Sequence, residues 1–192
     1  MKITIWPFFL LMVVIQWIIP GQMILQKEMV LLKGTAYKFK TAPVDPIDPF
    51  IGRYIILNFP QQSYSVSSKD PLQNAKTVYV TFKNNKAGFA EIDQVTASAP
   101  ERTDYLSTTI STLDVNKDSV SIFIQYPFNR FYMEESKAPE AERIYGTELA
   151  DSSSNVYALV SIYKGDAAIK NVYINDTTIT DMLKRRSVIM GD

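Results

Sequence analysis

A stretch without charged side chains near the N-terminus limits what this 192-residue chain can fold into. Residues 3–26 contain no Asp, Glu, Lys or Arg, and nearly every side chain between Ile3 and Ile19 is apolar. An α-helix rises 1.5 Å per residue, so about 20 residues cross a hydrocarbon core of roughly 30 Å. The sequence therefore predicts a membrane-spanning helix within residues 1–26, followed by a separate domain at residues 27–192.

The flanks of this segment indicate whether it is cleaved and how it is oriented. Residues 17–23 offer no small-residue triplet of the kind that signal peptidases cut, so we expect an uncleaved anchor. Trp6 and Trp17 are expected at the two membrane interfaces. More lysines follow the segment than precede it, but large domains translocate largely regardless of charge. We expect the N-terminus in the cytoplasm and the domain outside, in a single-pass protein of the cytoplasmic membrane.

The composition excludes several classes of function. The chain has no Cys and no His, which removes disulfides, thiol nucleophiles, Ser-His relays and zinc sites built on imidazole or thiolate ligands. Its 20 basic and 20 acidic residues balance, whereas nucleic-acid binding normally needs a basic face. Residues 114–118 begin like a calcium loop, but Ser119 and Gln125 occupy the positions that require Gly and Glu. We therefore expect no metal, no cofactor and no nucleic-acid partner.

The rest of the chain alternates with a period near two, which is typical of strands with one buried face. The strongest runs are rich in β-branched and aromatic residues. They are residues 37–40, 54–59, 78–82, 89–92, 120–126, 156–163 and 169–174. Turn residues at 84–88 and 164–167 separate neighbouring runs and fit antiparallel hairpins. The sequence predicts a mainly β domain, built as an antiparallel sheet, sandwich or barrel-like structure.

One segment of the domain has a helical character instead. Residues 137–149 contain good helix formers, an early Pro and acidic residues near the start, where the helix dipole favours them. We predict one short helix here. Residues 63–74 and 100–103 are expected to be loops, and the basic residues 184–186 are expected in a solvated tail.

A short segment before and within the second predicted strand carries a recognisable pattern. It contains Asp45, Asp48, Gly52, Tyr54, Leu57 and Phe59. This pattern resembles the motif of the GDYXXLXY family of bacterial membrane-anchored proteins. Gly52, Tyr54 and Leu57 match the motif, Phe59 replaces its final Tyr, and Arg53 replaces its Asp.

A second segment is similar to an Arg-aromatic element of the same family, with a nearby acid and a short acidic helix. Its residues here are Arg130, Tyr132, Glu134 and Glu142. The resemblance implies a single-pass anchored domain of uncharacterised activity. It also implies a partner, since such proteins are often encoded beside a multi-spanning membrane protein.

Two interpretations remain open for the residues before the strand. Asp45 and Asp48 can hold a cation or guide a peptide, but Asp-Pro pairs more often shape an extended turn. Gly52 is expected to provide an unusual backbone angle or a close approach.

Alternation along the strand separates its motif residues onto two faces. Ile55, Leu57 and Phe59 share one face. Tyr54 lies on the other, where we expect it to be exposed or hydrogen-bonded.

Arg130 also has two interpretations. Its guanidinium suits a bidentate contact with a carboxylate or phosphate of another molecule. An internal ion pair with Glu134, Glu135 or Glu142, which would join the helix to the sheet, is the more common arrangement. Such pairs add little net stability.

These observations lead to two hypotheses of function. The first is an anchored extracytoplasmic interaction module, which binds a multi-spanning membrane protein through its aromatic strands. The second is a hydrolase of the Ser/Lys, signal-peptidase-like type, since a chain without His would need Lys as the base. The first Ser after the membrane segment is Ser63, and no Ser-Met pair follows the anchor, so we favour the interaction module and expect no enzyme activity.

Overall fold

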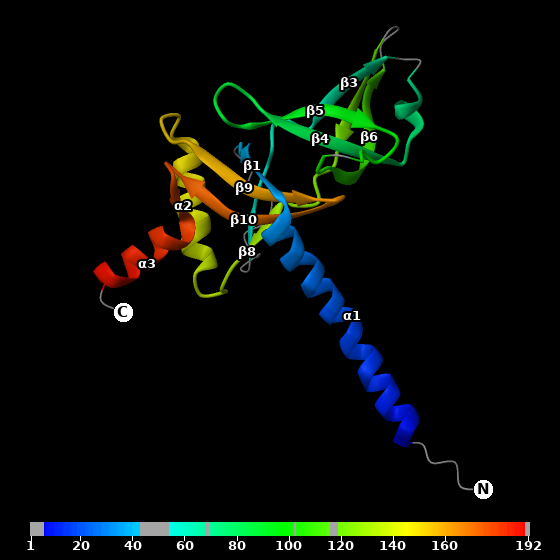
Figure 1. Cartoon of the computed structure of the whole chain (residues 1–192). Helices are drawn as coiled ribbons and strands as arrows, with labels where there is room; N and C mark the ends of the chain where they lie inside the picture. The colour runs from blue at the N-terminus through cyan, green and yellow to red at the C-terminus, as the bar shows by residue number, and fades with distance from the viewer. Residues whose placement is uncertain (1–5, 43–53, 68–69, 102, 116–118, 191–192) are drawn as a thin grey trace, which may run out of the picture.

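A computed structural model describes residues 6–42, 54–67, 70–101, 103–115 and 119–190 (Figure 1). Three α-helices, a short 3-10 helix and eleven strands follow one another along these residues. The order is α1 (Trp6–Lys33), β1 (Thr35–Lys40), β2 (Tyr54–Ile56), β3 (Ser63–Ser67), η1 (Pro71–Asn74), β4 (Thr77–Asn84), β5 (Ala90–Thr96), β6 (Leu106–Val115), β7 (Ser119–Ile124), β8 (Arg130–Tyr132), α2 (Ala138–Ala150), β9 (Val156–Tyr163), β10 (Asp166–Ile174), β11 (Thr177–Thr178) and α3 (Ile179–Met190).

Helix α1 projects from the domain as a single rod of 28 residues and is long and apolar enough to cross a membrane (Figure 1). It ends at Lys33, beyond the predicted boundary at residue 26. Trp6 and Trp17 lie about 16 Å apart along this continuous helix, which is about half of a hydrocarbon core of roughly 30 Å. The expectation that these two residues mark both interfaces is therefore wrong.

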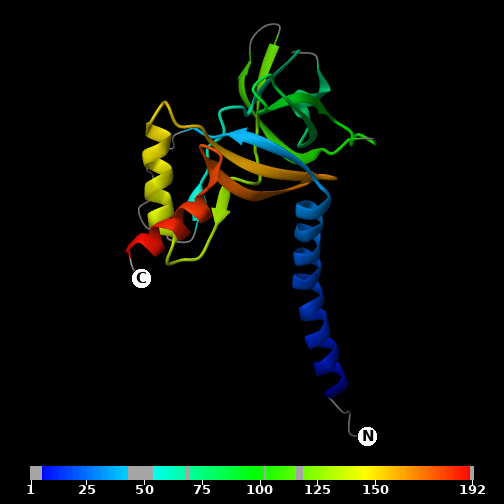
Figure 2. The same cartoon turned by 60° about the vertical axis from the view of Figure 1, so that its left-hand side comes forward.

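The domain confirms the prediction of a mainly β, antiparallel architecture (Figure 2). A five-stranded sheet has the order β3-β7-β6-β4-β5, and a four-stranded sheet has the order β1-β9-β10-β11. Strands β2 and β8 form a separate two-stranded ribbon. The predicted helix at 137–149 is α2, displaced by one residue. In both views α2 and α3 lie beside the four-stranded sheet, away from the five-stranded one (Figures 1 and 2).

Tight turns of left-handed backbone join the hairpins, as their sequences predict. Gly88 in the β4–β5 turn has φ of 81°, and the Asn85 side chain accepts hydrogen bonds from the backbone N–H of Ala87 and Phe89. The β9–β10 turn places Lys164 at φ 45° and Gly165 at φ 98°. Two positive φ angles in succession match the right-handed twist of the flanking strands, which explains why the β9–β10 hairpin can close with so short a turn.

The elements that the sequence analysis did not predict include β3, β6 and α3. Residues 63–74 are not wholly a loop, because Ser63–Ser67 forms β3 at the edge of the five-stranded sheet. Strand β6 was missed because Ser and Thr occupy positions where apolar residues were sought; Thr108 is buried and its hydroxyl donates to the Gln125 carbonyl. The expected solvated tail is helix α3, whose Arg186 donates to Glu140 of α2 at 2.7 Å.

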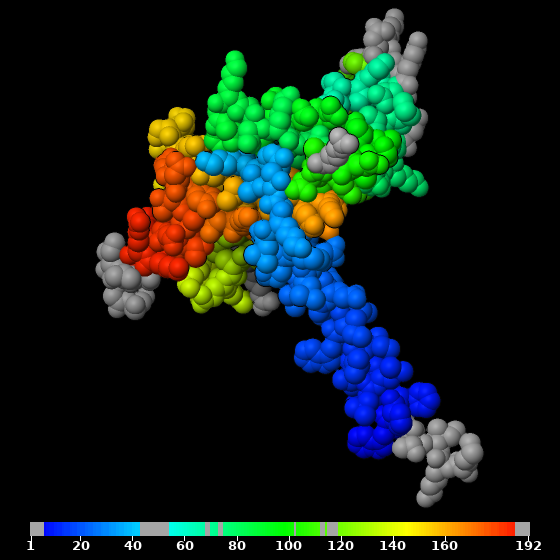
Figure 3. All heavy atoms as spheres, viewed as in Figure 1, coloured from blue at the N-terminus to red at the C-terminus, as the bar shows by residue number. Residues whose placement is uncertain are grey.

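The end of α1 is built into the four-stranded sheet. Figure 3 shows the β9–β10 turn, in orange, beside this end of the helix. Val30 is fully buried, and its carbonyl accepts hydrogen bonds from the Ser161 hydroxyl at 2.7 Å and from the Gly34 N–H at 3.0 Å. These contacts fix the direction in which the helix leaves the domain.

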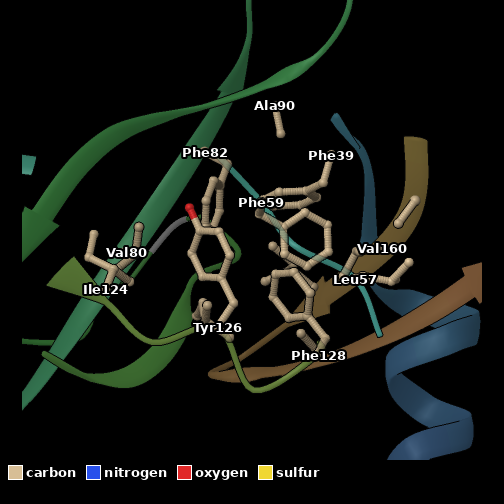
Figure 4. Close-up of a cluster of buried hydrophobic side chains, with 14 of the residues drawn as sticks. Phe39, Leu57, Phe59, Val80, Phe82, Ala90, Ile124, Tyr126, Phe128 and Val160 are labelled. Atoms are coloured by element: carbon tan, nitrogen blue, oxygen red, sulfur yellow. The ribbon is translucent and has the colours of Figure 1, made fainter. Parts of the chain in front are cut away.

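A cluster of aromatic rings fills the space between the sheets (Figure 4). Phe39 of β1 lies at its centre, with ring centroids 5.1–5.7 Å from four other rings in mostly edge-to-face geometry. These partners are Phe59, Phe82, Tyr126 and Phe128. Such packing is typical of aromatic cores, and it joins segments that are far apart in the sequence.

Candidate functional site

The segment from Tyr54 to Phe59 is divided between the core and the surface, as alternation predicts. Ile55, Leu57 and Phe59 are each at most 2% exposed. Tyr54 lies on the opposite face and is half-buried. Leu57 and Phe59 therefore stabilise the fold, and among the family-motif residues that the structure describes, Tyr54 is the one that is partly accessible to another molecule.

Pairing of β2 with β8 brings the second predicted segment next to the first. Tyr54 lies opposite Tyr132, and Ile56 lies opposite Arg130, in an antiparallel register. The Tyr54 and Tyr132 rings are 5.3 Å apart and tilted by 59°. The Arg130 guanidinium lies over the Tyr54 ring, 4.9 Å from its centroid. We call Tyr54, Arg130 and Tyr132 the ribbon triad.

The ribbon triad combines a large exposed ring with a cation. Tyr132 is 64% exposed, and Arg130 is also exposed. A cation over a ring in this way is attracted to its face, and a planar guanidinium is suited to a bidentate contact with a carboxylate. Tyr and Arg are the residue types that most often dominate protein–protein contacts.

The expected ion pair between Arg130 and the acids of the next segment is not formed. Within the part of the chain that the structure describes, no ion pair joins Arg130 to Glu134, Glu135 or Glu142. Glu134 instead accepts from Lys137 and from the Ser136 hydroxyl, and these hydrogen bonds lower the pKa of its carboxyl. Glu142 lies exposed on α2. The prediction failed because Lys137 is the partner of Glu134 and the Tyr54 ring is the partner of Arg130.

A different ion pair joins the helices. Glu140 of α2 accepts hydrogen bonds from Arg143 and Arg186, which lower the pKa of its carboxyl to about 2. Glu140 therefore stays ionised at any physiological pH. This contact secures α3 against α2, and the sequence pattern alone gave no indication of it.

The ribbon triad lies on a particular side of the domain. In Figures 1 and 2, β8 and the connection from β8 to α2 lie on the side from which α1 extends, and the five-stranded sheet lies on the opposite side. Tyr132 is the last residue of β8. The ribbon therefore lies on the side of the domain that carries α1.

The structure does not describe every predicted site residue. Asp45, Asp48 and Gly52 lie outside the described residues. In the described ranges, no group of three or more acidic side chains is arranged to hold a metal ion. Ser161 is fully buried and donates to the Val30 carbonyl, which gives this serine a structural role.

Comparisons with known proteins give one match. A family model described as GDYXXLXY protein matches residues 16–172, which begin within α1 and end within β10. No curated protein and no solved structure matches the chain. The matched range contains the whole β2–β8 ribbon and excludes α3.

Proposed function

The chain belongs to the GDYXXLXY protein family, and from this premise we propose that it is a membrane-anchored accessory protein that binds a multi-spanning membrane protein. Its β domain lies on the extracytoplasmic side of the cytoplasmic membrane, and α1 is its single anchor. The ribbon triad is the contact surface.

The exposed side chains of α1 support the proposal that this helix is a membrane anchor. Large apolar side chains from Trp6 to Leu32 are exposed along nearly its whole length, which water would penalise and lipid would accept. A helix embedded in the core of a soluble protein would bury these side chains. A large domain follows the helix, and large domains translocate largely regardless of the charge beside the helix, so we place this domain outside and the opposite end of α1 in the cytoplasm.

One observation carries the choice of partner surface. Among the residues outside α1 whose side-chain exposure the structure describes, Tyr132 is the only large hydrophobic side chain that is mostly exposed. It lies at the end of the ribbon on the side of α1, within reach of another protein in the same membrane. A soluble partner would have no reason to approach from this side.

A pull-down experiment tests this proposal. The full-length tagged protein is purified from mildly solubilised membranes beside a Tyr54→Ala, Arg130→Ala double variant, and the co-purifying proteins are identified. We expect a multi-spanning membrane protein with the wild type and at least about a tenfold smaller yield with the variant, because the centre of the contact is lost.

The chain offers a matched control for this variant. Lys38 lies over the Tyr157 ring at 4.9 Å, and Tyr157 stacks on Tyr173, so a second group of one cation and two tyrosines exists elsewhere. A Lys38→Ala, Tyr173→Ala variant is expected to retain the partner. Equal loss in both variants, or a wild-type protein that always purifies alone, would contradict the proposal.

A further inference from the structure

A groove of about 500 Å³ lies where α1 meets the β9–β10 turn. The helix contributes Gln22, Leu25 and Met29 to its wall, and the hairpin contributes Tyr163, Lys164 and Asp166. The helix side of the groove therefore combines the apolar Leu25 and Met29 with polar glutamines, and the turn side carries a cation and a carboxylate.

Three contacts between the helix and the hairpin hold the groove in shape. The Gln26 amide donates to the Asp166 carboxylate, and Lys27 Nζ lies 3.6 Å from the same carboxylate. Lys27 Nζ also donates to the Ala167 carbonyl at 3.2 Å. The negative charge of Asp166 is therefore offset within the wall.

The position of the groove along α1 indicates what surrounds it. If α1 is a membrane anchor, the about 20 residues from Trp6 to Leu25 span about 30 Å, so Gln26 lies near the outer edge of the hydrocarbon core. The groove begins at Gln22 and extends past Met29. It therefore occupies the layer of glycerol and headgroups.

Lys164 gives the groove a cation in this layer. Its Nζ lies over the Tyr163 ring, 5.4 Å from the centroid. Lys164 forms no ion pair with any of the described residues. Its backbone has φ of 45°, a conformation that Asn adopts far more readily than Lys. A lysine at such a turn position is unfavourable for the backbone, which suggests that its side chain serves another purpose.

The apolar residues of the groove can contact the hydrocarbon part of a molecule whose charged part lies at Lys164. Leu25 is 65% exposed and Met29 is 44% exposed, and both continue the apolar surface of α1 upward into the groove. Lys and Tyr are the residues that typically lie at a membrane interface, where an apolar part meets a charged headgroup.

We propose that this groove binds one phospholipid of the surrounding bilayer, with Lys164 at the phosphate and Leu25 and Met29 against the first acyl carbons. This inference rests on the membrane anchoring stated under the proposed function. Lipid in this position would fix the height and the tilt of the domain over the membrane.

Photolabelling tests the site in the full-length protein. The chain is reconstituted into phosphatidylcholine nanodiscs that contain a minor fraction of phosphatidylglycerol with a photoreactive group near its headgroup, and labelled peptides are mapped. We expect labels at residues 22–30 and 163–166. Asparagine favours the backbone conformation of this turn, so Lys164→Asn should keep the hairpin intact. Labelling of these residues should fall about fivefold in this variant, as expected for the loss of one positive charge at the membrane interface.

Lys86 provides the matched control. It lies in the β4–β5 turn, and this hairpin is on the opposite side of the domain from α1 (Figure 1). Lys86→Asn should label like the wild type. If α1 is labelled but residues 163–166 are not, or if Lys164→Asn labels unchanged, the groove is not a lipid site although the anchor stands. If α1 itself is unlabelled, the anchoring fails as well.

Discussion

Replacing Phe39 by alanine is expected to lower the free energy of unfolding by about 3–5 kcal/mol. Phe39 is 3% exposed, and its ring contacts four other aromatic rings from three segments of the chain (Figure 4). Removing it leaves a cavity that rigid neighbouring rings cannot fill. The loss should therefore include both the transfer free energy of the ring and the cost of the cavity.

The measurement is denaturant unfolding of the full chain in detergent, followed by far-ultraviolet circular dichroism. Tryptophan fluorescence is unsuitable, because Trp6 and Trp17 both lie in α1. Tyr132→Ala is the control, since an exposed ring should change the free energy of unfolding by no more than about 0.5 kcal/mol. Similar effects of both substitutions would mean that the aromatic cluster is not the centre of the core.

Replacing Gly34 by alanine is expected to cost about 1–3 kcal/mol and to loosen the junction between α1 and the sheet. An added Cβ would lie 2.6 Å from the Ser161 hydroxyl oxygen, 2.6 Å from the Val30 carbonyl oxygen and 2.7 Å from the Ile162 carbonyl oxygen. Two of these three atoms belong to the backbone, so no simple rotation of a side chain relieves the clash.

Gly146→Ala is the matched control for this substitution. Gly146 lies in α2 with nothing within 4 Å of an added Cβ. Alanine there should stabilise the protein by about 0.5–1 kcal/mol, because glycine is unfavourable within a helix. Thermal unfolding and limited proteolysis between α1 and β1 report the difference. Equal stability of the two variants would show that the junction is not tightly packed.

Local patterns predicted much of the fold. Alternation identified the buried face of the 54–59 segment, and turn residues such as Asn85, Gly88 and Gly165 identified the hairpins. These features succeed because strand faces and tight turns depend on residues that are adjacent in the sequence.

Helix α3 and strand β6 were not predicted, although the sequence contains a start signal for the helix. Helix α3 begins with a reciprocal cap, in which the Thr178 hydroxyl donates to the Asp181 carboxylate and accepts from the Asp181 N–H. The spacing of Thr and an acid by three residues is a known start signal, and it was available in the sequence. Strand β6 was harder to predict, because Thr108 occupies an inward position and needs the Gln125 carbonyl to be buried there.

The candidate site depended on contacts that no local pattern contains. Alternation predicts Tyr54 on the face opposite Ile55, either exposed or hydrogen-bonded, and the structure places it on that face, half-buried. Its pairing with Tyr132 and the stacking of Arg130 require β2 and β8 to meet across a long stretch of chain. Arg130 was therefore assigned to acids near it in sequence, whereas the sheet register gives it an aromatic partner.

Crosslinking from position 132 tests most directly whether the ribbon triad contacts a membrane protein. A photoreactive phenylalanine analogue is placed at Tyr132 in one variant and at Tyr173, in the four-stranded sheet, in another. Both are irradiated in intact membranes, and protein adducts are identified. We predict that position 132 forms an adduct with one multi-spanning membrane protein and that position 173 does not. Absence of any protein adduct at 132, or the same adducts at both positions, would contradict the account.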